Sequence, residues 1–310
     1  MGCILKTDKR NSIFRKKGDL MRALRDLLKR WYPAAIIAAG AMAVGALAGT
    51  NSAQAQGSRL EEVMQRGKLI VSTFGTSPPL CFTDEKGQLV GFDIDIARLI
   101  AKSMFGDPSK IDFVTVTSEG RWPSVLSGRA DFGIASTTVY PDRAMRVAFT
   151  RPYMDSGISL LVRKDAGVTS IADLNNAKFT LANLSNPQMV DRQKRFLPNT
   201  KTLTFDTPSA MFLAVKTGQA HAMQFDSPVV DWYGKENAQD LIVLPEMLGN
   251  VQNNAIFLKP GDFAWWLFLD TVVQELTAGS RYNEYVEVYQ KWFGRNPPPQ
   301  RFYGAAAAAK

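Results

Sequence analysis

The feature that most constrains the fold is an alternation of two hydrophobic patterns between residues 59 and 293. In segments such as Phe92 to Phe105, apolar residues recur three or four positions apart, which is typical of amphipathic helices. Between these segments lie short continuous apolar runs, such as Phe132 to Ala135, which are typical of buried strands. Repeated alternation of helices and strands predicts an α/β fold.

The patterns predict strands over residues 68–74, 111–116, 132–135, 158–162, 178–182, 202–205, 222–225, 241–244 and 254–258. They predict helices over residues 59–65, 92–105, 122–126, 187–196, 209–216, 263–276 and 282–293. We expect two α/β lobes, with lobe 1 formed by residues 57–156 and 255–303 and lobe 2 (residues 157–254) inserted into it. Crossover segments near residues 153–159 and 251–256 would join the lobes. A cleft between two lobes is a usual place for a small-molecule site.

Residues 1–55 have the anatomy of a secretory signal peptide. A basic run between Lys6 and Arg30 precedes an uncharged apolar stretch, and the small-x-small triplet Ala53-Gln54-Ala55 follows. The alternative is a retained membrane anchor, because an apolar stretch of about 20 residues can span a bilayer. The Ala and Gly content of the stretch and the triplet favour cleavage and export, with Met21 as an alternative start. Residues 304–310 are expected to be a disordered tail.

The positive net charge belongs to this leader. Ten of the 37 basic and three of the 29 acidic residues lie in it, which leaves 27 basic and 26 acidic residues in the remainder. A nearly neutral remainder does not support binding to nucleic acid. Cys81 is the only cysteine after the leader, so neither an internal disulfide nor a cysteine metal cluster can form there.

Residue patterns of common enzymes are missing from the sequence. Its one histidine, His221, lies in an apolar strand pattern, where a structural role is expected. No second histidine or cysteine pair is available to complete a transition-metal site. The sequence also lacks a Gly-x-Ser-x-Gly elbow, a phosphate-binding Gly-x4-Gly-Lys loop and a Gly-x-Gly-x-x-Gly motif. We therefore expect a protein without catalytic activity, metal or cofactor.

The segment from Ala135 to Arg143 has the residues of an anion site. Ser136, Thr137 and Thr138 follow directly on a predicted strand, and Arg143 closes the turn. Hydroxyl and backbone N–H groups at a helix start attract anions, and a guanidinium offers two parallel hydrogen bonds to a carboxylate. The alternative, an ordinary turn with a surface arginine, stays open on this segment alone.

Five segments, in order along residues 67–294, resemble the family 3 bacterial extracellular solute-binding proteins, which serve ABC transporters for polar amino acids. The segments are Pro78 to Asp95, Arg121 to Asp131, Thr138 to Arg143, Phe149 to Gly157 and Lys291 to Gly294. The resemblance implies a two-lobed periplasmic-binding-protein fold of type II, with the ligand in the cleft between the lobes.

The resemblance also implies roles for individual residues. Arg143 would bind the α-carboxylate of an amino acid, with Thr138 and Ser136 as hydrogen-bonding neighbours. Asp226, at the end of a predicted strand, would bind the α-ammonium group; a helix cap before Ser227 is the alternative. A zwitterion enclosed in a dry cleft needs both partners, because a buried unpaired charge costs several kcal/mol. Closure of the lobes would engage both charges together.

The second lobe departs from the family pattern. Leu184-Ser185-Asn186 stands where the family usually has Gly-Ser-Thr, and leucine would be strained at the positive φ that glycine allows. We expect Ser185 and Asn186 to contact the ligand, with an amide in place of a hydroxyl. His221 replaces a usual aspartate. Specificity for the ligand side chain is expected from residues that flank the family's pocket segments and could equally be core or rim: Phe74, Ser77, Phe82, Ser118 and Trp122.

The resulting expectation is a monomeric periplasmic protein that captures an amino acid or close derivative and delivers it to an inner-membrane ABC permease. Two alternatives remain. One is an enzyme resembling cyclohexadienyl dehydratase, which would need a carboxylate in the cleft as general acid or base. The other is a sensor module that presents its bound state to a membrane kinase.

Overall fold

The computed structural model describes residues 57–298, together with residues 22, 25 and 26. The predicted signal peptide, its start and the predicted tail over residues 304–310 lie outside the described residues. Within the described part of the chain, no helix has the length and apolar character needed to cross a bilayer.

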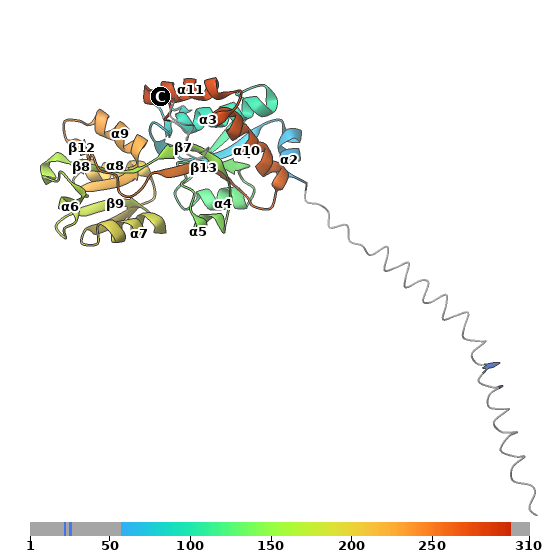
Figure 1. The fold of residues 1–310 in the computed structure, drawn as a ribbon, viewed down its shortest axis with the longest axis horizontal. Helices are drawn as coiled ribbons and strands as arrows, with labels where there is room; N and C mark the ends of the chain where they lie inside the picture. Colours follow the sequence, from blue (N-terminus) through green and yellow to red (C-terminus); the bar gives the residue numbers. More distant parts are fainter. Residues whose placement is uncertain (1–21, 23–24, 27–56, 299–310) are drawn as a thin grey trace, which may run out of the picture. The chain divides into compact units, whose positions relative to one another are not determined.

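Helices and strands alternate from Arg59 to Phe293 (Figure 1). The strands are β1 (Leu69–Thr73), β2 (Thr76–Ser77), β3 (Cys81–Thr83), β4 (Leu89–Val90), β5 (Ile111–Thr115), β6 (Phe132–Gly133), β7 (Ala148–Ser156), β8 (Ile158–Arg163), β9 (Thr180–Leu184), β10 (Lys201–Phe205), β11 (Ala222–Asp226), β12 (Leu241–Val243) and β13 (Gln252–Leu258). The helices are α2 (Arg59–Arg66), α3 (Phe92–Phe105), α4 (Arg121–Leu126), α5 (Pro141–Ala144), α6 (Ile171–Leu174), α7 (Pro187–Phe196), α8 (Pro208–Lys216), α9 (Ser227–Glu236), α10 (Phe263–Ala278) and α11 (Tyr282–Phe293), with a 3₁₀ turn at Lys164–Ala166.

Two five-stranded sheets form the centres of two lobes, which confirms the predicted fold class (Figure 1). The first sheet has the order β5-β1-β6-β13-β7, in which β1 is parallel to β5 and β6 while β13 runs antiparallel. The second has the order β10-β9-β11-β8-β12, in which β9 is parallel to β10 and β11. Because the carboxyl ends of parallel strands open a crevice, each lobe offers a binding edge there.

Two strands connect the lobes. β7 of the first sheet leads through Gly157 directly into β8 of the second, and β13 returns beside β7. Gln252 pairs with Ser156 and Asn253 with Asp155 in antiparallel register. The predicted crossover segments near residues 153–159 and 251–256 thus coincide with this pair of strands. The exact limits of the lobes, after residues 156 and 254, stay predictions.

Helices bury one face against each sheet. In α3, the fully buried Ile96 and Ile100 lie on one stripe, and in α10 Trp265 and Leu269 do the same. The buried indole N–H of Trp265 donates to the carbonyl of Asp131 at 2.9 Å, so burying this ring leaves no polar atom unsatisfied. These helices pack against the first sheet and fix the strand ends that carry the cavity described below.

The predicted strands and helices are all present, with ends displaced by up to two residues. The short sheet β2-β3-β4, the strand β7 and the helices α6 and α9 were not predicted. Strands of two or three residues are too short to show a period of two, and α9 is interrupted in sequence by Pro228 and Gly234.

One tight contact in the first sheet gives a stability prediction. A methyl group at Gly133 in β6 would lie 2.0 Å from Cζ of Phe257, its partner in β13. We expect Gly133→Ala to lower the free energy of unfolding by about 1–3 kcal/mol through overpacking. Urea denaturation of the ligand-free protein measures the change.

Replacing the partner ring provides the control. In the double variant Gly133→Ala/Phe257→Leu, the destabilisation should be smaller than the sum of the two single effects, because the clash is removed. A Gly133→Ala protein as stable as the wild type would contradict the predicted clash.

Candidate ligand-binding site

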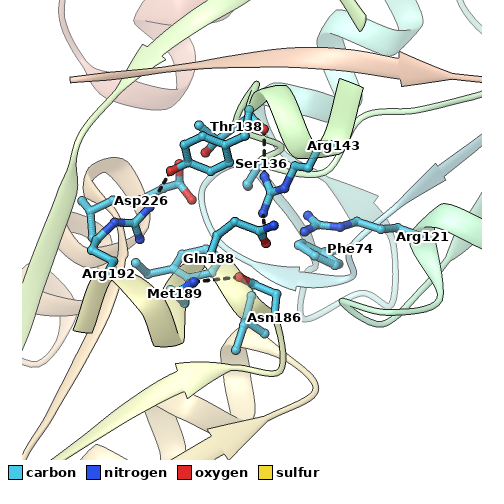
Figure 2. Close-up of a pocket in the computed structure, with 14 residues that line it drawn as sticks. Phe74, Arg121, Ser136, Thr138, Arg143, Asn186, Gln188, Met189, Arg192 and Asp226 are labelled. Carbon is cyan, nitrogen blue, oxygen red and sulfur yellow. Dashed lines mark hydrogen bonds between the residues drawn. The ribbon is translucent and has the colours of Figure 1, made fainter. Parts of the chain in front are cut away.

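A cavity lies between the two lobes, at the carboxyl ends of β1, β6, β9 and β11 (Figure 2). Side chains from both sheets line it. They are Phe74, Arg121, Ser136, Thr138, Tyr140, Arg143, Ile158, Leu184, Asn186, Gln188, Met189, Arg192, Phe225 and Asp226. Six predicted ligand residues are among them: Phe74, Ser136, Thr138, Arg143, Asn186 and Asp226.

Arg143 reaches the cavity from the short helix α5. It is only 8% exposed, so the surface-arginine alternative is wrong. Its Nη1 donates to the carbonyl of Thr138 at 2.8 Å and its Nη2 to Gln188 Oε1 at 3.3 Å, while Nε has no partner among the described residues. Burial lowers the pKa of the guanidinium, because the charged form loses hydration. Among the described residues, the hydrogen-bond acceptors of this buried cation are neutral oxygen atoms.

The loop that carries the hydroxyl residues is held in place by a buried carboxylate. Ser136 has a φ of +46°, a left-handed conformation that side chains other than glycine seldom adopt. The backbone N–H of Ser136 donates to Asp93 at 3.1 Å, and the hydroxyl of Tyr153 donates to the same carboxylate at 2.8 Å. Burial raises the pKa of Asp93 to about 6. These contacts fix the strained turn that places Thr138 beside Arg143.

Asp226 reaches the cavity from the other lobe, at the end of β11. Although it precedes α9, its side chain makes no capping hydrogen bond, which rules out the helix-cap alternative. It accepts a hydrogen bond from Nδ2 of Asn254 at 3.0 Å. Its pKa is raised, chiefly because burial disfavours the ionised carboxylate. Asp226 is thus a buried anion that faces the cavity.

Asn254 joins the two predicted charge-binding elements and was missed by sequence reasoning. It lies in the connecting strand β13, is fully buried, and forms an isolated β-bridge with Thr138. Its Oδ1 accepts from the hydroxyl of Thr138 at 3.4 Å, while its Nδ2 donates to Asp226. A single asparagine in a strand pattern gives no signal for such a role, because pairing across the lobes is not visible in sequence.

Arg121 is a second buried guanidinium on the cavity wall. It is the first residue of α4 and only 2% exposed. Its guanidinium carbon lies 4.4 Å from the ring centroid of Trp122 and 5.5 Å from that of Phe74. Nη1 makes long contacts to the carbonyl of Ala135 at 3.4 Å and to Thr137 Oγ1 at 3.3 Å, and Nε has no partner within the described part of the chain. Burial, with repulsion from Arg143, lowers the pKa of Arg121 to about 9.

The second-lobe wall is formed by the end of β9 and the start of α7. Leu184 lies in an extended strand, so the positive φ that would strain leucine is not adopted there. Asn186 caps α7 by accepting from the backbone N–H of Met189 at 3.0 Å. The amide thus takes the role of a helix cap while the residue still lines the cavity.

Side chains also bridge the lobes directly across the cavity. Gln188 of α7 contacts Arg143 and donates to the carboxylate of Asp142. Arg192 of the same helix donates to the hydroxyl of Tyr140 at 2.5 Å and to Gln252 Oε1 at 3.3 Å. Because these contacts join the two lobes, the lobes are in a closed arrangement around the site. Figure 2 shows the contact between Arg143 and Gln188.

Five predicted ligand residues do not line the cavity. The ring of Phe82 packs against two tryptophan rings, with centroids 6.0 and 5.9 Å away. Ser77 and Ser118 are buried elsewhere, and Ser185 donates its backbone N–H to Phe205. Trp122 lies behind Arg121 and lines a neighbouring hollow that also reaches Arg143. Adjacency to a motif in sequence therefore did not place these side chains in the cavity.

His221 has the structural role that was expected. Its Nδ1 accepts the backbone N–H of Thr180 at 3.1 Å, and its ring makes an edge contact with Phe179. It lies just before β11, outside the cavity wall.

The charges on the cavity wall are unequal. Three guanidiniums (Arg121, Arg143 and Arg192) face one carboxylate, Asp226. Among the residues that the structure describes, none of these four groups takes part in an ion pair. Buried charges of both signs, held apart and unpaired, are suited to a ligand that carries complementary charges.

Comparison with known proteins agrees with this geometry. The model of the bacterial extracellular solute-binding proteins, family 3, matches residues 69–295. The glutamine-binding protein of Geobacillus stearothermophilus is 33% identical over 204 residues, which cover 64% of this chain and 73% of the relative.

Solved structures show the same similarity. An ancestral amino-acid-binding protein, described as a precursor of cyclohexadienyl dehydratase, has a TM-score of 0.68 and 32% identity, covering 76% of this chain and all of the other. The L-cysteine receptor of Neisseria gonorrhoeae has a TM-score of 0.69 and 26% identity, covering 76% of this chain and 93% of the other. The chain belongs to the family 3 bacterial extracellular solute-binding proteins.

Proposed function

We propose that this protein captures an α-amino acid between its lobes and delivers it to an ABC permease. The observation that carries the proposal is the placement of Arg143 and Asp226. They enter one cavity from opposite lobes, are 8% and 5% exposed, and are ionisable groups of opposite sign without an ion-pair partner among the described residues. Membership of the family supports the same function.

An amino acid would provide a partner of opposite charge for both Arg143 and Asp226. Its carboxylate would accept two N–H bonds from Arg143, whose Nε has no partner among the described residues. Thr138 lines the same cavity and accepts from Arg143 through its backbone carbonyl. The ammonium group of the amino acid would donate to Asp226. Because burial disfavours both protein charges, a ligand that neutralises them gains affinity from interactions that water no longer provides.

The lobe-bridging contacts explain how capture would be signalled. Gln188 contacts Arg143 of α5, and Arg192 contacts Tyr140 just before α5, so these contacts join the lobes in the closed arrangement. The paired strands β7 and β13 are the described connections at which the lobes could bend. A ligand that binds both lobes favours the closed state. We propose that a permease recognises this closed form.

The remaining parts of the proposal concern location and chemistry. We propose that the protein is exported to the periplasm, acts as a monomer and is not an enzyme. Relatives named for glutamine and L-cysteine differ in ligand, so their names support an amino acid without choosing one.

Removing the Arg143 guanidinium tests the carboxylate half of the site. We expect Arg143→Ala to weaken binding of the best ligand in an amino-acid panel by roughly hundredfold or more, because one partner of a buried charge pair is lost. Isothermal titration calorimetry measures the affinity. Arg129→Ala, which removes an exposed arginine, should leave it unchanged. Unaltered affinity in Arg143→Ala would remove this residue from the site.

Neutralising Asp226 should change protein stability and ligand affinity in opposite directions. Because its pKa is raised, the ionised form is disfavoured in the folded state, and its contribution to stability falls as pH rises through the folded pKa. We expect ligand-free Asp226→Asn to be more stable than the wild type at pH 7, with a smaller difference at pH 4, yet to bind amino acids roughly tenfold to hundredfold more weakly.

Denaturant titration at both pH values and calorimetry measure these two effects. The exposed Asp240→Asn variant is the control for a change in net charge. Equal ligand affinity in Asp226→Asn and wild type would exclude Asp226 as the ammonium partner.

A dehydratase activity is the second candidate, favoured by the structural neighbour described as a precursor of cyclohexadienyl dehydratase. Among the described residues, Asp226 is the only carboxylate on the cavity wall, so it would have to serve as general acid or base. We expect no aromatic product when the protein is incubated with prephenate or arogenate and the mixture is analysed by chromatography. Product formation that Asp226→Asn abolishes would establish the enzyme instead.

A further inference from the structure

We infer that the ligand carries a second acidic group, and that Arg121 is the residue that binds it. The inference rests on the proposed function, because it assigns the α-carboxylate to Arg143 and the α-ammonium to Asp226. Once those two charges are neutralised, the guanidinium of Arg121 on the wall of the same cavity still lacks a partner of opposite charge among the described residues. The class of ligand that would neutralise this guanidinium is an amino acid with an anionic side chain, such as glutamate or aspartate.

The balance of charge on the wall supports this class. Three guanidiniums and one carboxylate line the cavity, and a zwitterion adds no net charge to them. Arg192 is contacted by neutral oxygen atoms of Tyr140 and Gln252. Arg121 has two contacts, of 3.3 and 3.4 Å, which involve one terminal nitrogen, and its Nε is unpartnered. Arg121 is therefore the guanidinium with the most unused donor capacity.

The position of Arg121 also suits a ligand side chain. Figure 2 shows its guanidinium directed toward the cavity, near the guanidinium of Arg143 and the amide of Gln188. The rings of Trp122 and Phe74 lie within 4.4 and 5.5 Å of the guanidinium carbon and hold it in place. A fixed guanidinium loses little side-chain entropy when a planar carboxylate binds it, and two parallel bonds favour a carboxylate over an amide.

Two nearby carboxylates do not remove the excess charge. Glu119 and Asp142 line the neighbouring hollow and are exposed to solvent, where water screens their attraction. Neither forms an ion pair with Arg121 or Arg143 among the described residues. A purely structural role for Arg121, through its contact with Trp122, would affect folding without distinguishing an acid from its amide.

Pairs of nearly isosteric ligands provide the test. Calorimetry with the full protein compares L-glutamate with L-glutamine and L-aspartate with L-asparagine. We expect the better acid to bind roughly tenfold to hundredfold more tightly than its amide, because an amide leaves the buried charge of Arg121 unneutralised. In Arg121→Gln, binding of the acid should weaken by a similar factor, and the acid-to-amide ratio should fall to about one.

Two further variants complete the design. Arg121→Lys keeps the charge without the planar fork and should retain part of the preference. Arg129→Gln removes an exposed arginine and should leave the ratio unchanged. If Arg121→Gln does not fold, the wild-type comparison of acids with amides still tests the ligand class, and an Arg121→Lys protein with the full wild-type preference would contradict the role of the Arg121 fork.

The outcomes distinguish this inference from the proposed function. If amides or neutral amino acids bind as tightly as acids, and Arg143→Ala abolishes that binding, the acidic subsite is wrong and the proposed function stands. If no amino acid binds, both fail. If acids are preferred but Arg121→Gln keeps the preference, Arg121 is not the binding residue.

Discussion

Unpaired charge enclosed between two lobes is the constraint on which the rest of this structure depends. Arg143, Arg121 and Asp226 are each more than nine-tenths buried, and the hydrogen bonds that reach them come from neutral groups. Such an arrangement lowers the stability of the empty protein, because desolvation of each charge is incompletely offset. The two buried sheets and their covering helices must supply the free energy that keeps these groups in place.

The fold positions these groups by simple means. Parallel strands end at the cavity in both lobes, so Phe74 and Ser136 follow β1 and β6 of the first sheet while Asp226 ends β11 of the second. The strained backbone of Ser136 is held by Asp93 from the start of α3. The first lobe thus contributes a rigid anion site, and the second contributes a carboxylate and a helix that closes over it.

Much of this could be predicted from the sequence, and the limits have physical reasons. The hydrophobic periods located the long elements, and family motifs pointed to Arg143 and Asp226, both of which line the cavity. Phe82 was predicted to contact the ligand because it lies near a motif, but long-range packing against tryptophans takes it elsewhere.

The residues in and around the cavity that were missed depend on contacts between distant parts of the chain. Arg121 begins one of the five segments that resemble the family, but that segment alone does not show that its side chain faces the cavity. Its burial beside Trp122 and its place on the cavity wall do. Asn254 acquires its role from pairing with Thr138, 116 residues away. No local pattern encodes that pairing. Asn254 is part of a connecting strand and also donates to Asp226. A change in the position of this carboxylate therefore alters a hydrogen bond at the place where the lobes are joined. The choice of ligand and the equilibrium between open and closed forms of the ligand-free protein are therefore coupled. A substitution that changes which ligand binds should also shift this equilibrium.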